Sequence, residues 1–254
     1  MPFRSIAAGL AVALGLSVCA DVAQAQGWGT VKGQITLPAG AAAPAPKKLD
    51  VNKDTEHCLK NGPILSEEWL VDANTKGVKN VFVWLAPAQA GAQMPVNPAL
   101  QAIPESQKNV EMDQPCCAFV PHCLALRQGQ VLTVKNSSPV AHNVRWTSKN
   151  NPGASVIVPA GQHHVINNLV ADTSPIGVNC DIHPWMKAWV RVFDHPYFAL
   201  TDANGNFEIK GAPAGTYQLV VWHEGAGWGD GGKKGTPITI KPDAVTQVKG
   251  NVKP

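Results

Sequence analysis

The chain has 254 residues, of which 21 are basic and 18 acidic, so its formal net charge is only +3. This mild balance argues against a nucleic-acid-binding protein, which needs a strongly basic surface. Charged residues make up only 15% of the chain, whereas glycine (23) and proline (21) are plentiful. Such a composition is typical of many short strands that are joined by tight turns.

The N-terminal segment has the features of an export signal. Arg4 supplies a positive charge, an apolar Ala/Leu-rich stretch covers residues 6–18, and residues 23–25 (AQA) match a cleavage site. The apolar stretch is short for a membrane span, and no other run is long enough to cross a bilayer. We therefore expect residues 1–25 to be a signal peptide and the mature protein to be periplasmic or extracellular, without a membrane span.

Beyond the signal, alternating apolar and polar residues predict strands, and long amphipathic helix patterns are absent. A short helix is expected within residues 97–109, and a hairpin turn at residues 202–205 (DANG). The predicted strands cover residues 31–37, 78–85, 131–135, 156–158, 164–166, 189–193, 207–210, 217–222 and 238–240. We therefore expect an all-β protein with a boundary near residue 196. The part after this boundary is close to the lower size limit for an independent core, so we expect it to borrow a strand such as residues 31–37.

The cysteine count indicates that at least one thiol is not in a disulfide. Once Cys19 is removed with the signal, five remain: Cys58, Cys116, Cys117, Cys123 and Cys180. An odd number cannot all pair within one chain, so one is a free thiol or a metal ligand. If Cys180 binds a metal, the other four allow three pairings. Adjacent cysteines suit disulfide geometry poorly, so we expect Cys58 to pair with Cys116 or Cys117.

A short loop at residues 180–186 (CDIHPWM) concentrates three metal-ligand types. It places a thiolate, an imidazole and a thioether at the spacing C-x2-H-x2-M. A blue-copper site uses one cysteine and two histidines in a plane, with a weak axial methionine. The loop lacks the second histidine, which must come from another strand. His142 meets this need, because it follows a predicted strand and a polar turn.

These two segments together resemble the ligand segments of the cupredoxins. The segments are residues 134–144 (VKNSSPVAHNV) and the CDIHPWM loop, whose spacing is similar to that of amicyanin. The resemblance implies a cupredoxin Greek-key β-sandwich that binds one copper ion, cycling between Cu(I) and Cu(II). It implies that His142, Cys180 and His183 bind copper in the plane. Met186 would be the axial ligand.

The same resemblance assigns roles to residues around the ligands. Asn143 would tie the two ligand segments together and tune the thiolate. His183, at the tip of the loop, would offer an exposed imidazole edge for electron transfer. Pro184 and Trp185 would either form an apolar docking patch or pack around the copper. The implied activity is electron transfer rather than catalysis, with an exported redox partner such as a cytochrome or a dehydrogenase.

A second resemblance covers residues 188–224. This stretch is similar to exported bacterial proteins often labelled methylamine-utilisation or plastocyanin-like, in which a carboxypeptidase-regulatory-like, transthyretin-like β-module follows a cupredoxin. The module's signature is TDANGNF together with PAGTY. We therefore expect a division after the signal into an N-terminal β elaboration, a cupredoxin copper domain and this small β-sandwich module. Their expected bounds are residues 26–110, 111–196 and 197–254.

Two other functions remain open. Cys116, Cys117 and Cys123, with the adjacent His122, could bind Cu(I) for copper carriage, because thiolates favour Cu(I). An oxidising compartment favours disulfides over such a thiolate cluster. Alternatively, the cupredoxin fold is a non-redox scaffold, and the C-terminal module binds a protein or a glycan.

Overall fold

The computed structural model describes residue 1 and residues 27–254, so the expected signal peptide lies almost entirely outside the described residues. The described part is all-β, as expected, with sixteen strands and a single turn of α-helix, α1 (Thr55–Cys58). Three short 3-10 helices complete it, at Pro98–Leu100, Glu105–Gln107 and Gly232–Lys234. Within these residues no helix is long and apolar enough to span a membrane.

The first of two β-sandwiches contains the residues of the expected copper domain. A five-stranded sheet, in the order β4-β10-β9-β6-β7, packs on a three-stranded sheet in the order β3-β5-β8. The bounds are β3 (Asn109–Met112), β4 (Cys123–Arg127), β5 (Val131–Lys135), β6 (His142–Thr147), β7 (Ala154–Val158), β8 (His163–Ile166), β9 (Ile176–Asn179) and β10 (Lys187–Phe193). Pairs β3–β5 and β4–β10 are parallel, and the other pairs are antiparallel. Apolar side chains of both sheets form one buried core between them.

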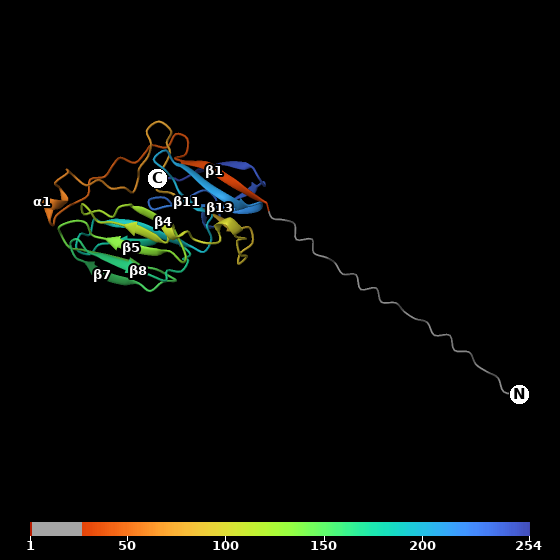
Figure 1. Cartoon of the computed structure of the whole chain (residues 1–254). Coiled ribbons are helices and arrows are strands. Elements are labelled where there is room, and N and C mark those ends of the chain that lie inside the picture. Colours follow the sequence, from red (N-terminus) through yellow and green to blue (C-terminus); the bar gives the residue numbers. More distant parts are fainter. Residues whose placement is uncertain (2–26) are drawn as a thin grey trace.

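The second sandwich combines strands from both ends of the chain (Figure 1). One sheet has the order β12-β1-β16, and the other has the order β11-β2-β13-β14, with β15 also paired to β13. The bounds are β1 (Trp28–Thr36), β2 (Phe82–Pro87), β11 (Phe198–Leu200), β12 (Asn206–Pro213), β13 (Gly215–His223), β14 (Gly227–Trp228), β15 (Thr236–Ile240) and β16 (Val245–Asn251). The expected borrowing of an N-terminal strand is confirmed by β1, and β2 is a second borrowed strand.

An aromatic cluster joins the two sandwiches. Phe82 and Trp84 of β2 and Trp222 of β13 pack with Phe193 of β10 in a buried apolar cluster that is separate from both sandwich cores. The guanidinium of Arg191 lies 4.3 Å from the ring centroid of Trp84, in a cation–π contact. The outer face of the β4–β10 pair is therefore covered by the second sandwich, which fixes the two relative to one another.

The segment between β1 and β2 reaches from the second sandwich to the first. In Figure 1 it runs along the top of the molecule to α1, which lies beside the first sandwich. A disulfide between Cys58 of α1 and Cys117 attaches it there. Residues of the expected N-terminal elaboration therefore contribute both to the second sandwich and to the surroundings of the CDIHPWM loop.

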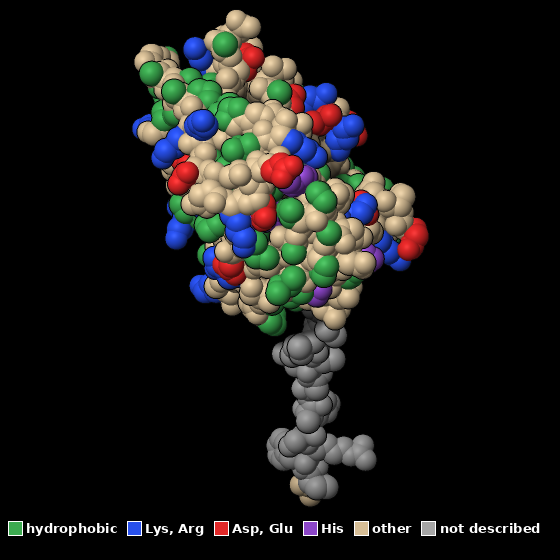
Figure 2. All heavy atoms as spheres, turned by 90° about the vertical axis from the view of Figure 1, so that its left-hand side faces the viewer, with side chains coloured by type: hydrophobic (Ala, Val, Ile, Leu, Met, Phe, Trp, Pro, Cys, Tyr) green, Lys and Arg blue, Asp and Glu red, His purple; other side chains and the backbone are tan. Residues whose placement is uncertain are grey.

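The face that carries α1 shows no large area of one charge. Figure 2 views the molecule from this side, with basic and acidic side chains interspersed among apolar ones. This distribution agrees with the mild net charge of the whole chain.

Candidate metal centre

His142 is positioned by the turn that precedes it. Asn136 donates hydrogen bonds from its side chain to the carbonyls of Val140 (2.9 Å) and Val158 (2.8 Å). Its side-chain oxygen accepts one from the amide of Ser138 at 3.1 Å. The polar residues of this turn therefore replace the hydrogen bonds that a strand would provide, and they hold His142 at the first position of β6.

The CDIHPWM loop connects β9 to β10 and is closed by its own backbone. The amide of Cys180 donates to the carbonyl of Met186 at 3.3 Å, and the amide of Met186 donates to the carbonyl of His183 at 2.9 Å. The amide of His183 donates to Sγ of Cys180 at 3.4 Å. All three side chains are thus held in one tight turn, and an amide donor stabilises negative charge on the sulfur.

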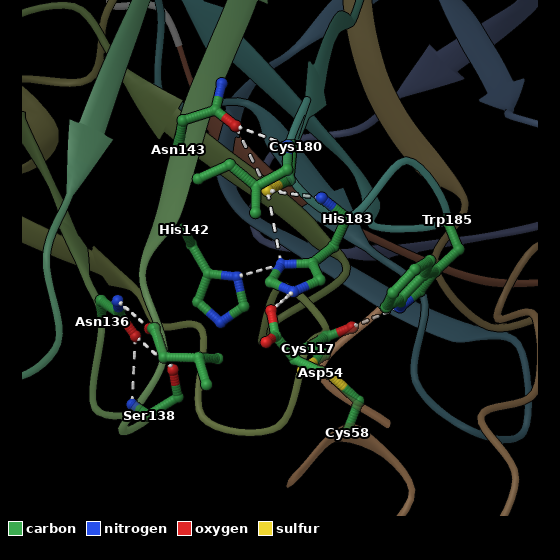
Figure 3. A network of polar contacts seen from close by, with 12 residues as sticks. Asp54, Cys58, Cys117, Asn136, Ser138, His142, Asn143, Cys180, His183 and Trp185 are labelled. Carbon is green, nitrogen blue, oxygen red and sulfur yellow. Dashed lines mark hydrogen bonds and ion pairs between the residues drawn. A yellow bond between two sulfur atoms is a disulfide. The ribbon is translucent and has the colours of Figure 1, made fainter. Parts of the chain in front are cut away.

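The structure brings three of the four expected ligands together (Figure 3). Nδ1 of His142 lies 2.9 Å from Nδ1 of His183, which lies 3.9 Å from Sγ of Cys180. One ligand atom from each of these residues lies within 4.8 Å of the others, and all three residues are buried. Met186, the expected axial ligand, is buried at the end of the same loop.

The protonation of His142 suits a metal ligand. Burial, followed by the nearby His183, lowers the pKa of His142 to about 4, so its imidazole is neutral at neutral pH. Neutral imidazole is the form that binds metals. Nε2 of His142 is buried and has no hydrogen-bond partner within the described residues. Two buried imidazoles with a thiol and a nearby thioether form a donor set that fits copper.

Asn143 connects β6 to the CDIHPWM loop. Its side-chain oxygen accepts hydrogen bonds from the amides of Asp181 (2.6 Å) and Ile182 (3.2 Å), and from the thiol of Cys180 at 3.3 Å. Its side-chain amide donates to the carboxylate of Asp181 at 2.9 Å and to the hydroxyl of Ser155 at 3.0 Å. One side chain therefore fixes the separation between the segment that carries His142 and the loop that carries Cys180.

The expectation that His183 exposes an imidazole edge is wrong. The residue is 0% exposed, and its Nε2 lies 2.8 Å from Oδ2 of Asp54. The segment before α1 covers the ring edge that would otherwise face solvent. Sequence reasoning did not find Asp54, because it lies 129 positions from His183 and matches no motif. The expected pairing of Cys58 was the only signal that this segment lies close to the centre.

The two expected docking residues lie at different depths. Pro184 is exposed, whereas Trp185 is half-buried. The indole N–H of Trp185 donates to the carbonyl of Cys117 at 3.1 Å, and its ring centroid lies 5.1 Å from that of His183. Both residues line a cleft that also contains His122 and Glu224. Trp185 therefore packs beside the centre and also reaches a surface depression.

The alternative function, a Cu(I) site made of clustered cysteines, is not supported by the structure. Cys117 forms a disulfide with Cys58, which confirms one of the two expected pairings and removes Cys117 as a thiolate. Cys123 is buried in the aromatic cluster, and burial raises the pKa of its thiol. The ring of His122 is hydrogen-bonded to Glu224 at 2.6 Å. A thiolate site made of Cys116, Cys117 and Cys123 is therefore incompatible with the observed disulfide.

The comparisons with known proteins give partial likenesses only. No family model matches the chain, and no curated protein matches it. Among solved structures, a Cu-containing nitrite reductase from Thermus scotoductus SA-01 is 19% identical over 40% of this chain, with a TM-score of 0.32, and the match spans 28% of that protein. A Cu(I) amicyanin variant is 18% identical over 34% of this chain and 83% of its own, with a TM-score of 0.30. A purple cupredoxin from Nitrosopumilus maritimus is 17% identical over 33% of this chain and 98% of its own, with a TM-score of 0.29.

Proposed function

We propose that this protein is an exported, mononuclear type 1 copper protein that carries single electrons between redox partners. One observation carries the proposal: two imidazole Nδ1 atoms and a cysteine sulfur meet in a buried group at the end of a β-sandwich. His142, Cys180 and His183 would hold the ion, with Met186 as a weak fourth ligand. Copper bound there would supply a reversible one-electron couple.

The protein's contribution is to hold the ligands in place during a change of oxidation state. His142 lies on a strand, and Asn143 fastens the CDIHPWM loop to that strand. Cu(I) and Cu(II) prefer different geometries, so a ligand set that can rearrange little lowers the cost of electron transfer. His142, Cys180 and His183 are all buried, which would keep water away from a bound ion.

The proposed partner is another exported redox protein, such as a cytochrome or a dehydrogenase. We propose electron carriage rather than catalysis, because one thiolate, two imidazoles and a thioether are the donor set of a blue-copper electron-transfer site. Pro184 is an exposed residue of the loop, and Trp185 lies between the proposed ligand His183 and the adjoining cleft. We propose these two residues as contact points for a partner.

The test is to load the purified mature protein with Cu(II) and to record visible and EPR spectra. We expect a strong thiolate-to-copper charge-transfer band and a narrow copper hyperfine splitting, both lost in Cys180→Ser. Cys116→Ser is the matched control, because Cys116 is a free thiol outside the centre, and it should keep both signals. A wild-type protein without these signals, or a Cys180→Ser variant that retains them, would contradict the assigned site. Absence of any copper uptake would favour the scaffold function.

A further inference from the structure

We propose that Asp54 is a positioning residue for His183, and that it takes the place of solvent at the outer edge of this copper ligand. Oδ2 of Asp54 lies 2.8 Å from Nε2 of His183, on the side of the ring opposite to Cys180 and His142 (Figure 3). The inference rests on the proposed function, because it gives Asp54 a role toward a bound copper ion.

The two nitrogens of His183 have separate partners. Nδ1 faces Nδ1 of His142 and Sγ of Cys180, and Nε2 faces the carboxylate of Asp54. A carboxylate can only accept a hydrogen bond, so Nε2 must carry the proton of a neutral ring. Nδ1 is then left with its lone pair directed toward the centre. Carboxylate partners of this kind fix the tautomer and the orientation of metal-binding histidines.

The placement of Asp54 suits this contact and not helix capping. Asp54 occupies the N-cap position of α1, where an aspartate normally accepts a hydrogen bond from a helix amide. Its side chain caps no amide of α1, although its carbonyl accepts from the amide of Cys58 at 2.9 Å. Its backbone is left-handed (φ 46°, ψ 37°), which is uncommon for a residue with a side chain. The carboxylate is therefore directed to His183 at the expense of its usual local bond.

A covalent link holds Asp54 in this position. We name residues 50–58 the strap. Cys58, at the end of the strap, is bonded to Cys117, whose carbonyl accepts the indole N–H of Trp185. Trp185 belongs to the CDIHPWM loop, as does His183. Through Cys117 and Trp185, the strap is thus attached to the same loop that the carboxylate of Asp54 contacts.

The carboxylate should affect the copper couple as well as the geometry. Cu(II) carries one more positive charge than Cu(I), so a nearby negative charge stabilises Cu(II) more strongly. Removing this charge should raise the midpoint potential. Loss of a carboxylate that supports a metal-binding histidine typically weakens metal binding about 10–100-fold. We expect a loss of Cu(II) affinity of this size in Asp54→Asn.

The experiment compares Asp54→Asn with Glu56→Gln in the full mature protein. Glu56 lies on the same strap and is exposed, so its variant removes the same charge without removing the contact. Cu(II) affinity is measured by competition with a chelator, and the midpoint potential by redox titration at one neutral pH. We expect a higher potential and a weaker Cu(II) affinity in Asp54→Asn only. Equal values in the two variants would overturn the inference.

A metal-free readout separates this inference from the proposed function. Nitrogen NMR of the apoprotein reports which nitrogen of His183 carries the proton. Wild type and Glu56→Gln should show the Nε2–H form, whereas Asp54→Asn should show a mixture, because an amide can donate as well as accept. If wild type binds no copper, the proposed function fails, and the tautomer still decides whether Asp54 positions the ring. An unchanged tautomer in a folded Asp54→Asn variant would overturn the positioning role.

Discussion

Glu224 joins the two sandwiches through His122. Nε2 of His122, which directly precedes β4, lies 2.6 Å from Oε1 of Glu224, which directly follows β13. The other carboxylate oxygen accepts a hydrogen bond from the indole of Trp189 on β10. One side chain of the second sandwich therefore contacts both β10 and the residue that precedes the neighbouring strand β4. The side chains of His122 and Glu224 are each only 10% exposed, so solvent screens their pairing weakly.

This pair should make the stability of the protein depend on pH. Burial opposes the charge of His122, but the hydrogen bond to Glu224 and its charge outweigh burial and raise the pKa of His122 above 6.5. Burial likewise opposes the charge of Glu224, but the hydrogen bond to His122 and its charge lower the pKa of Glu224 below 4.5. The contribution of His122 to the free energy of unfolding is complete below pH 6.5 and is lost as pH rises through its raised pKa. The contribution of Glu224 to the free energy of unfolding is complete above pH 4.5 and is lost as pH falls through its lowered pKa.

We therefore expect Glu224→Gln to lower the free energy of unfolding most between about pH 4.5 and 6.5, by about 1–3 kcal/mol. Urea unfolding of the metal-free protein at a series of pH values measures this difference. Glu105→Gln, which removes an exposed charge elsewhere, should change stability little at any pH. A difference between wild type and Glu224→Gln that does not vary with pH would show that the pair is not ionic in the folded protein.

Asn143→Ala should destabilise the apoprotein as well as the proposed copper site. The substitution leaves the amides of Asp181 and Ile182 without their acceptor. We therefore expect the free energy of unfolding, measured with urea, to fall by about 1–3 kcal/mol. Ser155→Ala is the control, because Ser155 contacts the carboxylate of Asp181, as Asn143 does, but not the loop amides that Asn143 binds. Its free energy of unfolding should fall clearly less. Equal losses would mean that the loop amides find other partners when Asn143 is removed.

The two segments that bear the expected ligands could be predicted because their information is local. The C-x2-H-x2-M spacing lies within one loop, and the predicted strand at residues 131–135 coincides with β5. The expected helix within residues 97–109 is observed only as two short 3-10 helices. Pro98 and Pro104 explain this difference, because proline lacks an amide donor and interrupts a helix interior.

Contacts between distant segments could not be predicted in the same way. Periodicity indicates which face of a strand is buried, but not which strand lies beside it. The short strand β9 gives too few residues for a clear alternation, and it was not expected. The contact between Asp54 and His183 depends on the path of the strap, which the disulfide of Cys58 determines. Sequence reasoning that treats His183 as an isolated loop residue therefore predicts an exposed ring.

The disulfide between Cys58 and Cys117 should contribute strongly to stability. It closes a loop across a sequence separation of 59, which restricts the unfolded chain. We expect the free energy of unfolding of the double variant Cys58→Ser/Cys117→Ser, measured with urea, to be about 2–4 kcal/mol lower than that of wild type. Cys116→Ser removes the adjacent free thiol and should change the free energy of unfolding little. If Cys116→Ser were as unstable as the double variant, the pairing in solution would involve Cys116 instead.

The C-terminal module should not fold without the N-terminal strands. β1 lies between β12 and β16, and β2 lies between β11 and β13, so each sheet of the second sandwich has a central strand from the N-terminal part. A fragment of residues 197–254 would leave β12 and β16 without a common partner and would expose apolar sheet edges. We expect this fragment to show the circular dichroism and narrow proton NMR dispersion of an unfolded chain.

Co-expression supplies the control for that prediction. A second fragment, residues 27–87, contains β1 and β2 and should restore dispersed NMR signals when it is produced together with residues 197–254. A shorter fragment, residues 27–60, lacks β2 and should not do so, because β11 and β13 would still lack their shared neighbour. Cooperative unfolding of residues 197–254 alone would show instead that the module is independent and that β1 and β2 only add to its edges.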